Sequence, residues 1–244
     1  MMAARIERLL KAVLALAAGL ALTTLAAQAA DYCTKNSGAA AVDTSVPVDV
    51  PFLDKMRDVG VGTIIRYYDH VDETIRGKTL HRTERDLIFS HGFAIAVVFQ
   101  HYNQKFASFT PERGAADAER SLVLAAENAQ PPNSAIYFGV DGGWKTPEQL
   151  ASIEAYFRAA DAGLAGSGYR VGVYGSGLVC RTLLGKGLAE LCWLSNARTW
   201  PEYEPYRKSL KWKLLQRLES RCGGRGVDFD LTNGTDTDFG QFGP

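Results

Sequence analysis

The sequence predicts an α/β fold, a compact TIM-like (β/α)8 barrel in a single domain. Eight short apolar segments with strand character alternate with helical patterns along the chain. The strand segments are near-continuous apolar runs, which is typical of parallel strands that are covered on both faces. Eight β/α units in about 215 residues suit a small closed barrel. A doubly wound open sheet is the alternative architecture.

The composition agrees with a folded domain. The 244 residues include 27 basic and 27 acidic side chains, and 46% of the chain is hydrophobic. This mixture excludes a disordered chain, a collagen-like repeat and a coiled coil. The balanced charge also argues against a nucleic-acid partner, because there is no basic excess to neutralise phosphates.

The first thirty residues predict export. Arg5, Arg8 and Lys11 precede the apolar run 12–22, and the small-residue stretch 26–30 offers an Ala-x-Ala cleavage site. We therefore expect a Sec-type signal peptide over residues 1–29 and a secreted or periplasmic barrel domain over residues 30–244. The alternative is an uncleaved membrane anchor, although the apolar run is short for a bilayer span. We expect no stable membrane span after cleavage.

The first half of the chain has four expected strands, over residues 40–43, 61–68, 93–100 and 135–141. The first ends in an acid, the second is β-branched and aromatic, and the last two are continuous apolar runs. Between them, residues 50–59 predict a helix with Pro51 in its first turn. Thr83 can cap a second helix, and Thr110 opens a long helix that the prolines at 131–132 end.

The second half repeats the alternation. Thr146-Pro147 predicts the start of a helix that ends at the glycine-rich residues 166–168. Residues 178–184 and the stretch after Trp200 predict two shorter helices. The remaining strands are expected over residues 169–174, 191–196, 211–216 and 227–231.

The four cysteines predict disulfides, because an even number in an exported protein favours pairing. Of the three possible pairings we favour Cys180–Cys192, which joins neighbouring segments, with Cys33–Cys222, which ties the chain ends together. A zinc site is the alternative, but no C-x-x-C spacing and no nearby histidine support it.

A barrel carries its site at the carboxyl ends of its strands. Polar and aromatic residues fall at or near these ends, and rings mixed with carboxylates are typical of sugar sites. The candidates are Asp43, Tyr67, Gln100, Asp141, Tyr174, Trp193, Gln216, Asp228 and Asp230.

Each acid also has a structural alternative. Asp141 ends an apolar strand, so burial could tune its acidity, or its carboxylate could bind the amides of the turn at Gly142. Asp228 and Asp230 alternate along one strand and therefore point to one side, but one of them could instead pair with Arg225. Asp43 could cap the loop before the helix at 50–59.

An ordered series of short motifs resembles a known family. The chain looks like the DUF1906, or Rv2525c-like, glycoside-hydrolase-like domains, which are similar in turn to the muramidases of glycoside hydrolase family 25. The matching motifs cover nearly all of the chain after the signal peptide. They are Val42-Asp43-Thr44, Ile65-Arg66-Tyr67-Tyr68, Val97-Val98-Phe99-Gln100, Ile136-Tyr137-Phe138-Gly139-Val140-Asp141, Val171-Gly172-Val173-Tyr174-Gly175, Trp193-Leu194-Ser195, residues 212–216 and Val227-Asp228-Phe229-Asp230.

This resemblance implies a TIM-like barrel and a cell-envelope carbohydrate ligand. In the muramidases the fourth strand ends in Asp-x-Glu, and the Glu donates the proton. Asp141 matches that Asp, but Gly143 stands at the position of the Glu. Asp43 and Asp228 match the acids of the first and last strands. Because hydrolysis needs a protonated acid and a second carboxylate, another acid would have to replace the missing one.

Three hypotheses follow. In the first, the barrel hydrolyses a cell-wall glycan, with Asp141 as a catalytic carboxylate and Asp43 or Asp228 as its partner. Substrate-binding residues would then be Tyr67, Gln100, Tyr174, Trp193, Gln216 and Asp230. In the second, it binds the glycan without cleaving it; in the third, it is a structural envelope protein. We expect a monomer that uses no metal and no cofactor.

Overall fold

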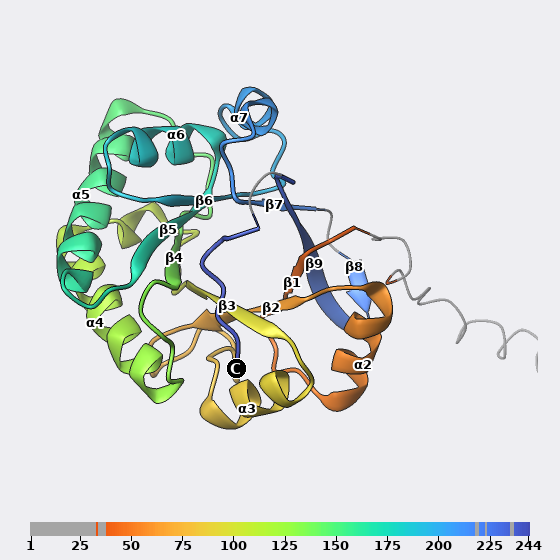
Figure 1. The fold of residues 1–244 in the computed structure, drawn as a ribbon. Coiled ribbons are helices and arrows are strands. Elements are labelled where there is room, and N and C mark those ends of the chain that lie inside the picture. The colour runs from red at the N-terminus through yellow and green to blue at the C-terminus, as the bar shows by residue number, and fades with distance from the viewer. Residues whose placement is uncertain (1–32, 34–37, 218–219, 223, 235–236) are drawn as a thin grey trace, which may run out of the picture. The chain divides into compact units, whose positions relative to one another are not determined.

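A closed ring of eight strands forms the centre of the protein (Figure 1). The structure is a computed structural model that describes residue 33 and residues 38–217, 220–222, 224–234 and 237–244. The strand order is β1-β2-β3-β4-β5-β6-β7-β9, and pairing of β1 with β9 closes the ring. The strands are β1 (Ala41–Asp43), β2 (Thr63–Tyr68), β3 (Ala94–Phe99), β4 (Ala135–Gly139), β5 (Arg170–Gly175), β6 (Leu191–Leu194), β7 (Leu214–Gln216), β8 (Ser220–Cys222) and β9 (Arg225–Thr232). The predicted TIM-like barrel is therefore confirmed.

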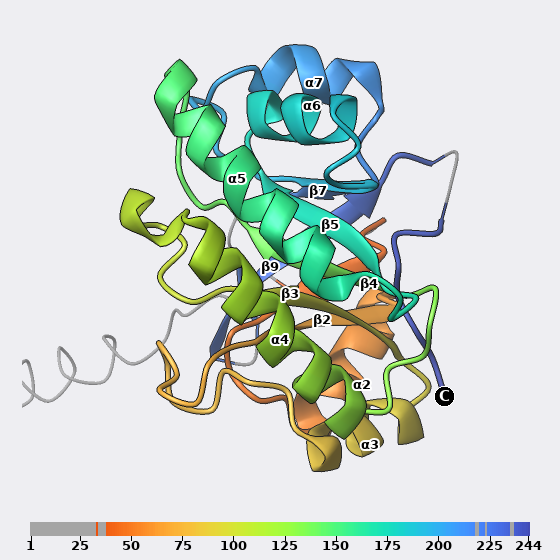
Figure 2. The same cartoon turned by 90° about the vertical axis from the view of Figure 1, so that its left-hand side faces the viewer.

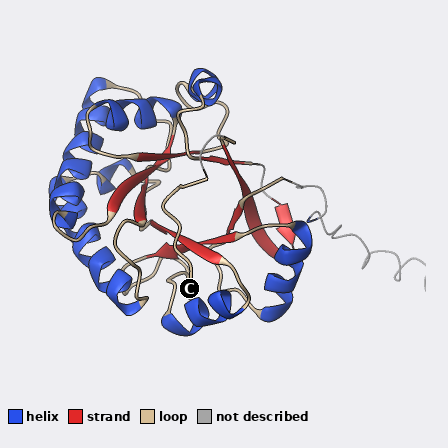
Figure 3. Cartoon of the chain, in the orientation of Figure 1, coloured by secondary structure: helices blue, strands red, loops and turns tan. Residues whose placement is uncertain are grey.

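Helices surround the barrel, as Figures 2 and 3 show. They are α2 (Val50–Val59), α3 (Arg82–Ser90), α4 (Pro111–Glu127), α5 (Pro147–Leu164), α6 (Gly177–Gly185) and α7 (Tyr203–Ser209), with a short 3-10 helix at Phe106–Ser108. Capping fixes several starts: the side chains of Asp49, Thr110, Thr146 and Ser176 each accept a backbone N–H of the helix that follows. Thr83 caps no helix, because α3 begins one residue earlier, after His81.

One strand runs against the expected direction. Strands β1 to β7 are parallel, but β9 is antiparallel to both β1 and β7. Only residues 217–224 separate β7 from β9, and a parallel crossover needs about a dozen residues or more. The chain therefore turns back, and β8 pairs with the start of β9 as a hairpin.

Alternation along the strands separates two cores. One lies between the barrel and the helices, and the other fills the barrel with side chains such as Ile65, Tyr137 and Trp193. The interior is tight: a Cβ at Gly172 would lie 2.5 Å from the Tyr137 ring. Only glycine at this position leaves room for that ring.

The C-terminal segment closes one end of the barrel. Phe239 packs in the interior core, Phe242 pairs with Ile95, and the Gly240 carbonyl accepts the Ala135 amide, all at strand starts (Figure 1). Asp238 forms an ion pair with Arg170 at 2.7 Å. The strands β1 to β7 finish at the opposite end of the barrel.

Two disulfides join the chain as predicted, Cys33–Cys222 and Cys180–Cys192. The expected signal peptide, residues 1–29, lies outside the described residues. Within the part that is described, no helix has the length and apolar character of a membrane span.

Candidate functional site

Each strand of the ring brings a polar side chain to the open end of the barrel, which we call the mouth. In strand order these residues are Asp43, Tyr67, Gln100, Asp141, Tyr174, Ser195, Gln216 and Asp228. Alternation puts them on the inner face of their strands or just after it. Most of them line one cavity of about 250 Å³, and Asp43 lines an adjoining cavity of about 190 Å³.

A hydrogen-bonded network joins the first and last strands of the ring. Asp43 and Asp228 are directly opposite across the β1–β9 seam. Tyr67 donates its hydroxyl to Asp43 at 2.8 Å, and Gln216 Nε2 lies 3.2 Å from Asp43 and 3.0 Å from Asp228. Burial raises the pKa of Asp43 to about 6, although the bonds from Tyr67 and Gln216 act in the opposite direction. This carboxyl therefore titrates near neutral pH.

Asp230 lies one layer below this network, inside the barrel. It is fully buried, and Trp193 Nε1 donates to its Oδ1 at 2.7 Å. Its Oδ2 has no hydrogen-bond partner among the described residues. Burial and the nearby charge of Asp43 raise the pKa of Asp230 well above its usual value. Asp230 and Trp193 thus form the floor of the mouth.

Asp141 faces this network from the opposite side. It follows β4, which is separated from β9 by β1–β3 in one direction and by β5–β7 in the other. Within the described chain its carboxylate has one hydrogen bond, a long contact of 3.4 Å from Gln100 Nε2, and none from the turn at Gly142. Burial raises its pKa, and the charge of Lys78 opposes that shift. The turn-binding alternative for Asp141 is therefore not what the structure contains.

Tyr174 connects the two sides of the mouth. Its hydroxyl lies 3.0 Å from Ser195 Oγ and 2.9 Å from Gln216 Oε1. Its ring packs edge-to-face against Trp193, with the ring centroids 4.9 Å apart. Burial raises the pKa of Tyr174, with further contributions from the charges of Asp141, Asp43 and Asp228. The phenol therefore stays protonated and positions Gln216.

The structural alternatives for the other acids also fail. Asp49 caps α2, so Asp43 is not used for capping. Arg225 bonds Asp49 and the Pro47 carbonyl. Asp228 and Asp230 do lie on one side, as expected, but the start of β9 reaches the mouth, because that strand is antiparallel.

Two cations lie behind the mouth: Arg66, from the motif Ile65-Arg66-Tyr67-Tyr68, and Lys78, which sequence reasoning missed. Lys78 is buried, with Nζ 2.6 Å from the Gln100 carbonyl and 4.9 Å from the centre of the Tyr67 ring. Burial lowers the pKa of Lys78. Arg66 is fully buried, pairs with Glu84 at 2.7 Å and donates to the Thr44 and Lys78 carbonyls. Both cations hold loops around the mouth. Lys78 lies in a loop and Arg66 on β2, and the partners of both are distant in sequence, which leaves no periodic signal.

The residue at the Glu position of the muramidase motif leaves little space. A Cβ at Gly143 would lie 3.2 Å from Cδ1 of Trp200, which is tighter than ordinary contact. The indole of Trp200 therefore borders the place where that family carries its proton donor. Across the described chain, no group of three or more His, Cys, Asp or Glu side chains is arranged to hold a metal ion.

Residues 54–230 match the model of a protein family described as "Rv2525c-like, glycoside hydrolase-like domain". The uncharacterized protein FadG of Bacillus subtilis is 25% identical over 167 residues, which are 67% of this chain and 29% of that protein. The chain therefore spans less than a third of this curated relative.

Solved structures share the fold. The Tat-secreted protein Rv2525c of Mycobacterium tuberculosis, in complex with L-tartrate, superimposes with a TM-score of 0.68 at 22% identity, over 84% of this chain and 99% of that one. The autolysin LytC of Streptococcus pneumoniae, in complex with a synthetic peptidoglycan ligand, gives a TM-score of 0.53 at 16% identity, over 78% and 46%. With a family match that spans most of the chain, the protein belongs to the Rv2525c-like, glycoside hydrolase-like domain family.

Proposed function

We propose that the protein binds a peptidoglycan-type cell-wall glycan in the mouth of the barrel and hydrolyses a glycosidic bond there. The observation that carries this proposal is that Asp141 and Asp228 line one cavity from opposite strands of the ring. Glycoside hydrolysis needs two carboxyl groups on either side of the scissile bond. Rings and amides around the same cavity suit a sugar, because they offer flat apolar faces beside hydrogen-bonding groups.

The two acids have environments that favour different roles. Burial raises the pKa of Asp141, which favours the protonated form that gives its proton to the leaving glycosidic oxygen. Gln216 donates to Asp228 and orients its carboxylate, which takes a proton from the attacking water. Asp43, beside Asp228, stabilises the oxocarbenium-like transition state when it is ionised.

The relatives support this ligand class. The family is glycoside hydrolase-like, and LytC, which shares the fold, was solved with a peptidoglycan ligand. One observation favours a second function, glycan binding without cleavage: Gly143 supplies no acid, and Trp200 borders its position. The two functions share the ligand and differ only in turnover.

One experiment separates them. Purified protein is incubated with peptidoglycan from pH 4 to 8, and both released reducing ends and co-sedimentation with the cell walls are measured. Asp141→Asn and Asp228→Asn should each reduce release by about 100-fold or more while sedimentation persists. The control is Asp58→Asn, an exposed acid on α2. Retention without release by the wild type would leave the binding function, and no retention at all would reject both.

We also propose that the protein acts outside the cytoplasm. Its two disulfides are typical of oxidising compartments, and the sequence predicts a signal peptide over residues 1–29. N-terminal sequencing of the exported protein should begin at residue 30 or 31. Full-length protein retained in the cytoplasm with reduced thiols would contradict this.

A further inference from the structure

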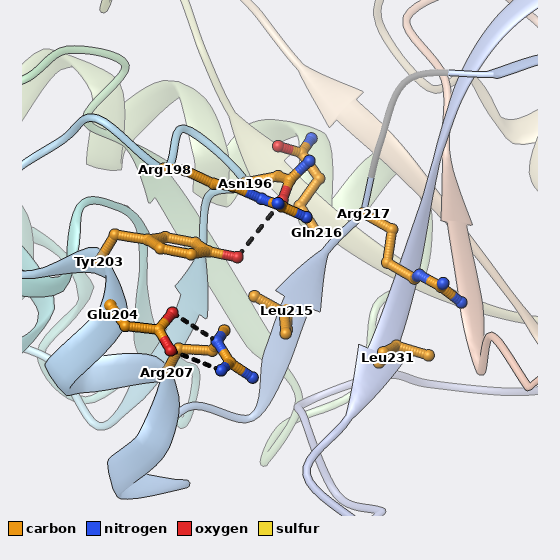
Figure 4. A pocket seen from close by; sticks show the side chains of 9 residues that line it. All are labelled: Asn196, Arg198, Tyr203, Glu204, Arg207, Leu215, Gln216, Arg217 and Leu231. Atoms are coloured by element: carbon orange, nitrogen blue, oxygen red, sulfur yellow. Dashed lines mark hydrogen bonds and ion pairs between the residues drawn. The ribbon is translucent and has the colours of Figure 1, made fainter.

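A second cavity lies beside the mouth, on the side of β7. Its volume is about 450 Å³, and it lies between α7, the loop after β6, and strands β7 and β9 (Figure 4). Gln216 lines both this cavity and the mouth. The end of β7 at Gln216 therefore lies between the two cavities.

The reversed last strand explains why this space exists. Leu215 of β7 and Leu231 of β9 are register partners, and both line the second cavity. The next register pair, Gln216 and Asp230, alternates to the other face of the sheet. Among the residues that the structure describes, no helix lies between β7 and β9 in the chain, because a hairpin replaces it. The two leucines thus provide an apolar floor, and Tyr203 of α7 forms a wall, with its hydroxyl 3.4 Å from Asn196 (Figure 4).

Three arginines surround this floor, and we call the cavity the arginine groove after Arg198, Arg207 and Arg217. Arg207 is engaged by Glu204 through two bonds of 2.9 and 2.7 Å. Within the described chain, no carboxylate lies within 4.0 Å of the guanidinium of Arg198 or Arg217. The described residues that line the groove carry three guanidinium groups and one carboxylate, which is a net positive charge.

The mouth is lined by acids and not by arginines. Asp43 and Asp228 repel an anionic group when they are ionised, whereas the groove beside them attracts it. The planar fork of an arginine matches the two oxygens of a carboxylate. The mouth and the arginine groove together therefore suit a ligand with a neutral sugar ring at one end and a carboxylate at the other.

We propose that the arginine groove holds a carboxylate carried by the glycan whose sugar ring occupies the mouth. The protein is then selective for acidic glycans over neutral ones, with Arg198 and Arg217 as specificity-determining residues. This proposal rests on the proposed glycan-binding function of the mouth. The carboxylate can belong to a peptide-bearing sugar of peptidoglycan or to a uronic acid, and both present the same group to the arginines.

The test is a titration with three ligands: a neutral chitin oligosaccharide, a soluble peptidoglycan fragment with its peptide, and an oligouronate. Wild-type protein should bind at least one of the acidic ligands about tenfold more tightly than the neutral one, as expected for charge-assisted hydrogen bonds. The difference should shrink as sodium chloride is raised. Whichever acidic ligand binds more tightly identifies the source of the carboxylate.

The double variant Arg198→Ala/Arg217→Ala should lose about tenfold or more in affinity for the acidic ligand and keep its affinity for the neutral one. The matched control is Arg82→Ala/Arg158→Ala, which removes two exposed arginines on α3 and α5. Circular dichroism and thermal melting verify that each variant is folded, and Arg198→Lys/Arg217→Lys, which retains the charge, should keep part of the affinity.

Equal wild-type affinity for neutral and acidic ligands would overturn the arginine groove and leave glycan binding in the mouth intact. So would an equal loss for both ligand classes in the double variant. A wild-type protein that binds none of the three ligands would overturn the groove together with the proposed function. Thus the two failures are distinguishable.

Discussion

The two ends of the barrel have opposite chemistry. At the closed end, Phe239 is buried in the interior core, and the Tyr137 hydroxyl donates to the Phe239 carbonyl at 2.8 Å. At the mouth, three acids have raised pKa values, and Asp230 Oδ2 is buried without a hydrogen-bond partner in the described chain. Buried carboxylates are destabilising unless they are paired. The closed end therefore stabilises the fold, whereas the mouth contains destabilising groups of the kind that cluster at functional sites.

The largest expected effect is at the closed end. Phe239→Ala should lower the free energy of unfolding by about 3–5 kcal/mol, because it removes a buried ring and opens the base of the barrel. Denaturant titration measures this. Leu210→Ala, at an exposed leucine, is the control, and a change below about 1 kcal/mol for Phe239→Ala would show that the segment does not support the barrel.

The next effect is the pH dependence of the mouth. The pKa of Asp43 is about 6 in the folded protein and 3.8 in the unfolded chain, so the folded state binds the proton more tightly. Ionising Asp43 therefore destabilises the fold: this contribution is absent below pH 3.8 and grows to about 3 kcal/mol as the pH rises past 6. Asp43→Asn should remove much of the fall in stability between pH 4 and 7.

Melting temperatures across this pH range test the prediction, with Asp58→Asn as the exposed control. Asp141 and Asp230 have pKa values shifted in the same direction, so a residual slope should remain in Asp43→Asn. A variant whose profile is parallel to that of the wild type would mean that Asp43 does not titrate in this window.

Two tyrosine variants compare the ends directly. Tyr137→Phe should lower the free energy of unfolding by about 1–2 kcal/mol, because it removes a buried hydrogen bond at the closed end. Tyr174→Phe should have a smaller effect on stability and weaken glycan binding, because its hydroxyl positions Gln216 at the open mouth. Denaturation and glycan-binding measurements on both variants test this. A larger loss of stability in Tyr174→Phe than in Tyr137→Phe would contradict the division between the two ends.

The smallest effect should come from Asp230→Asn. Burial raises the pKa of Asp230 well above its usual value, which favours the neutral carboxyl, and an asparagine of the same shape imitates that form. Its oxygen can still accept the bond from Trp193. The free energy of unfolding should change by less than about 1 kcal/mol in denaturant titrations, and a loss above about 3 kcal/mol would indicate an ionised carboxylate.

Much of this architecture was predictable from local patterns. Apolar runs located the strands, and the polar residue at or near each strand end located the mouth from Asp43 to Asp228. The direction of β9 was not predictable from its own residues, because it depends on the short connection from β7. The roles of Lys78, Arg66 and the C-terminal segment also escaped prediction, since their contacts join residues that are distant in sequence and carry no periodicity.

The mouth is assembled only when the first strand of the ring, β1, pairs with the last, β9. Asp43 comes from the first strand and Asp228 from the last, and they become neighbours only when the ring closes. A chain interrupted before residue 228 lacks Asp228 and Asp230 and leaves β1 and β7 without their pairing to that part of β9. Closure of the ring therefore brings the two acids together.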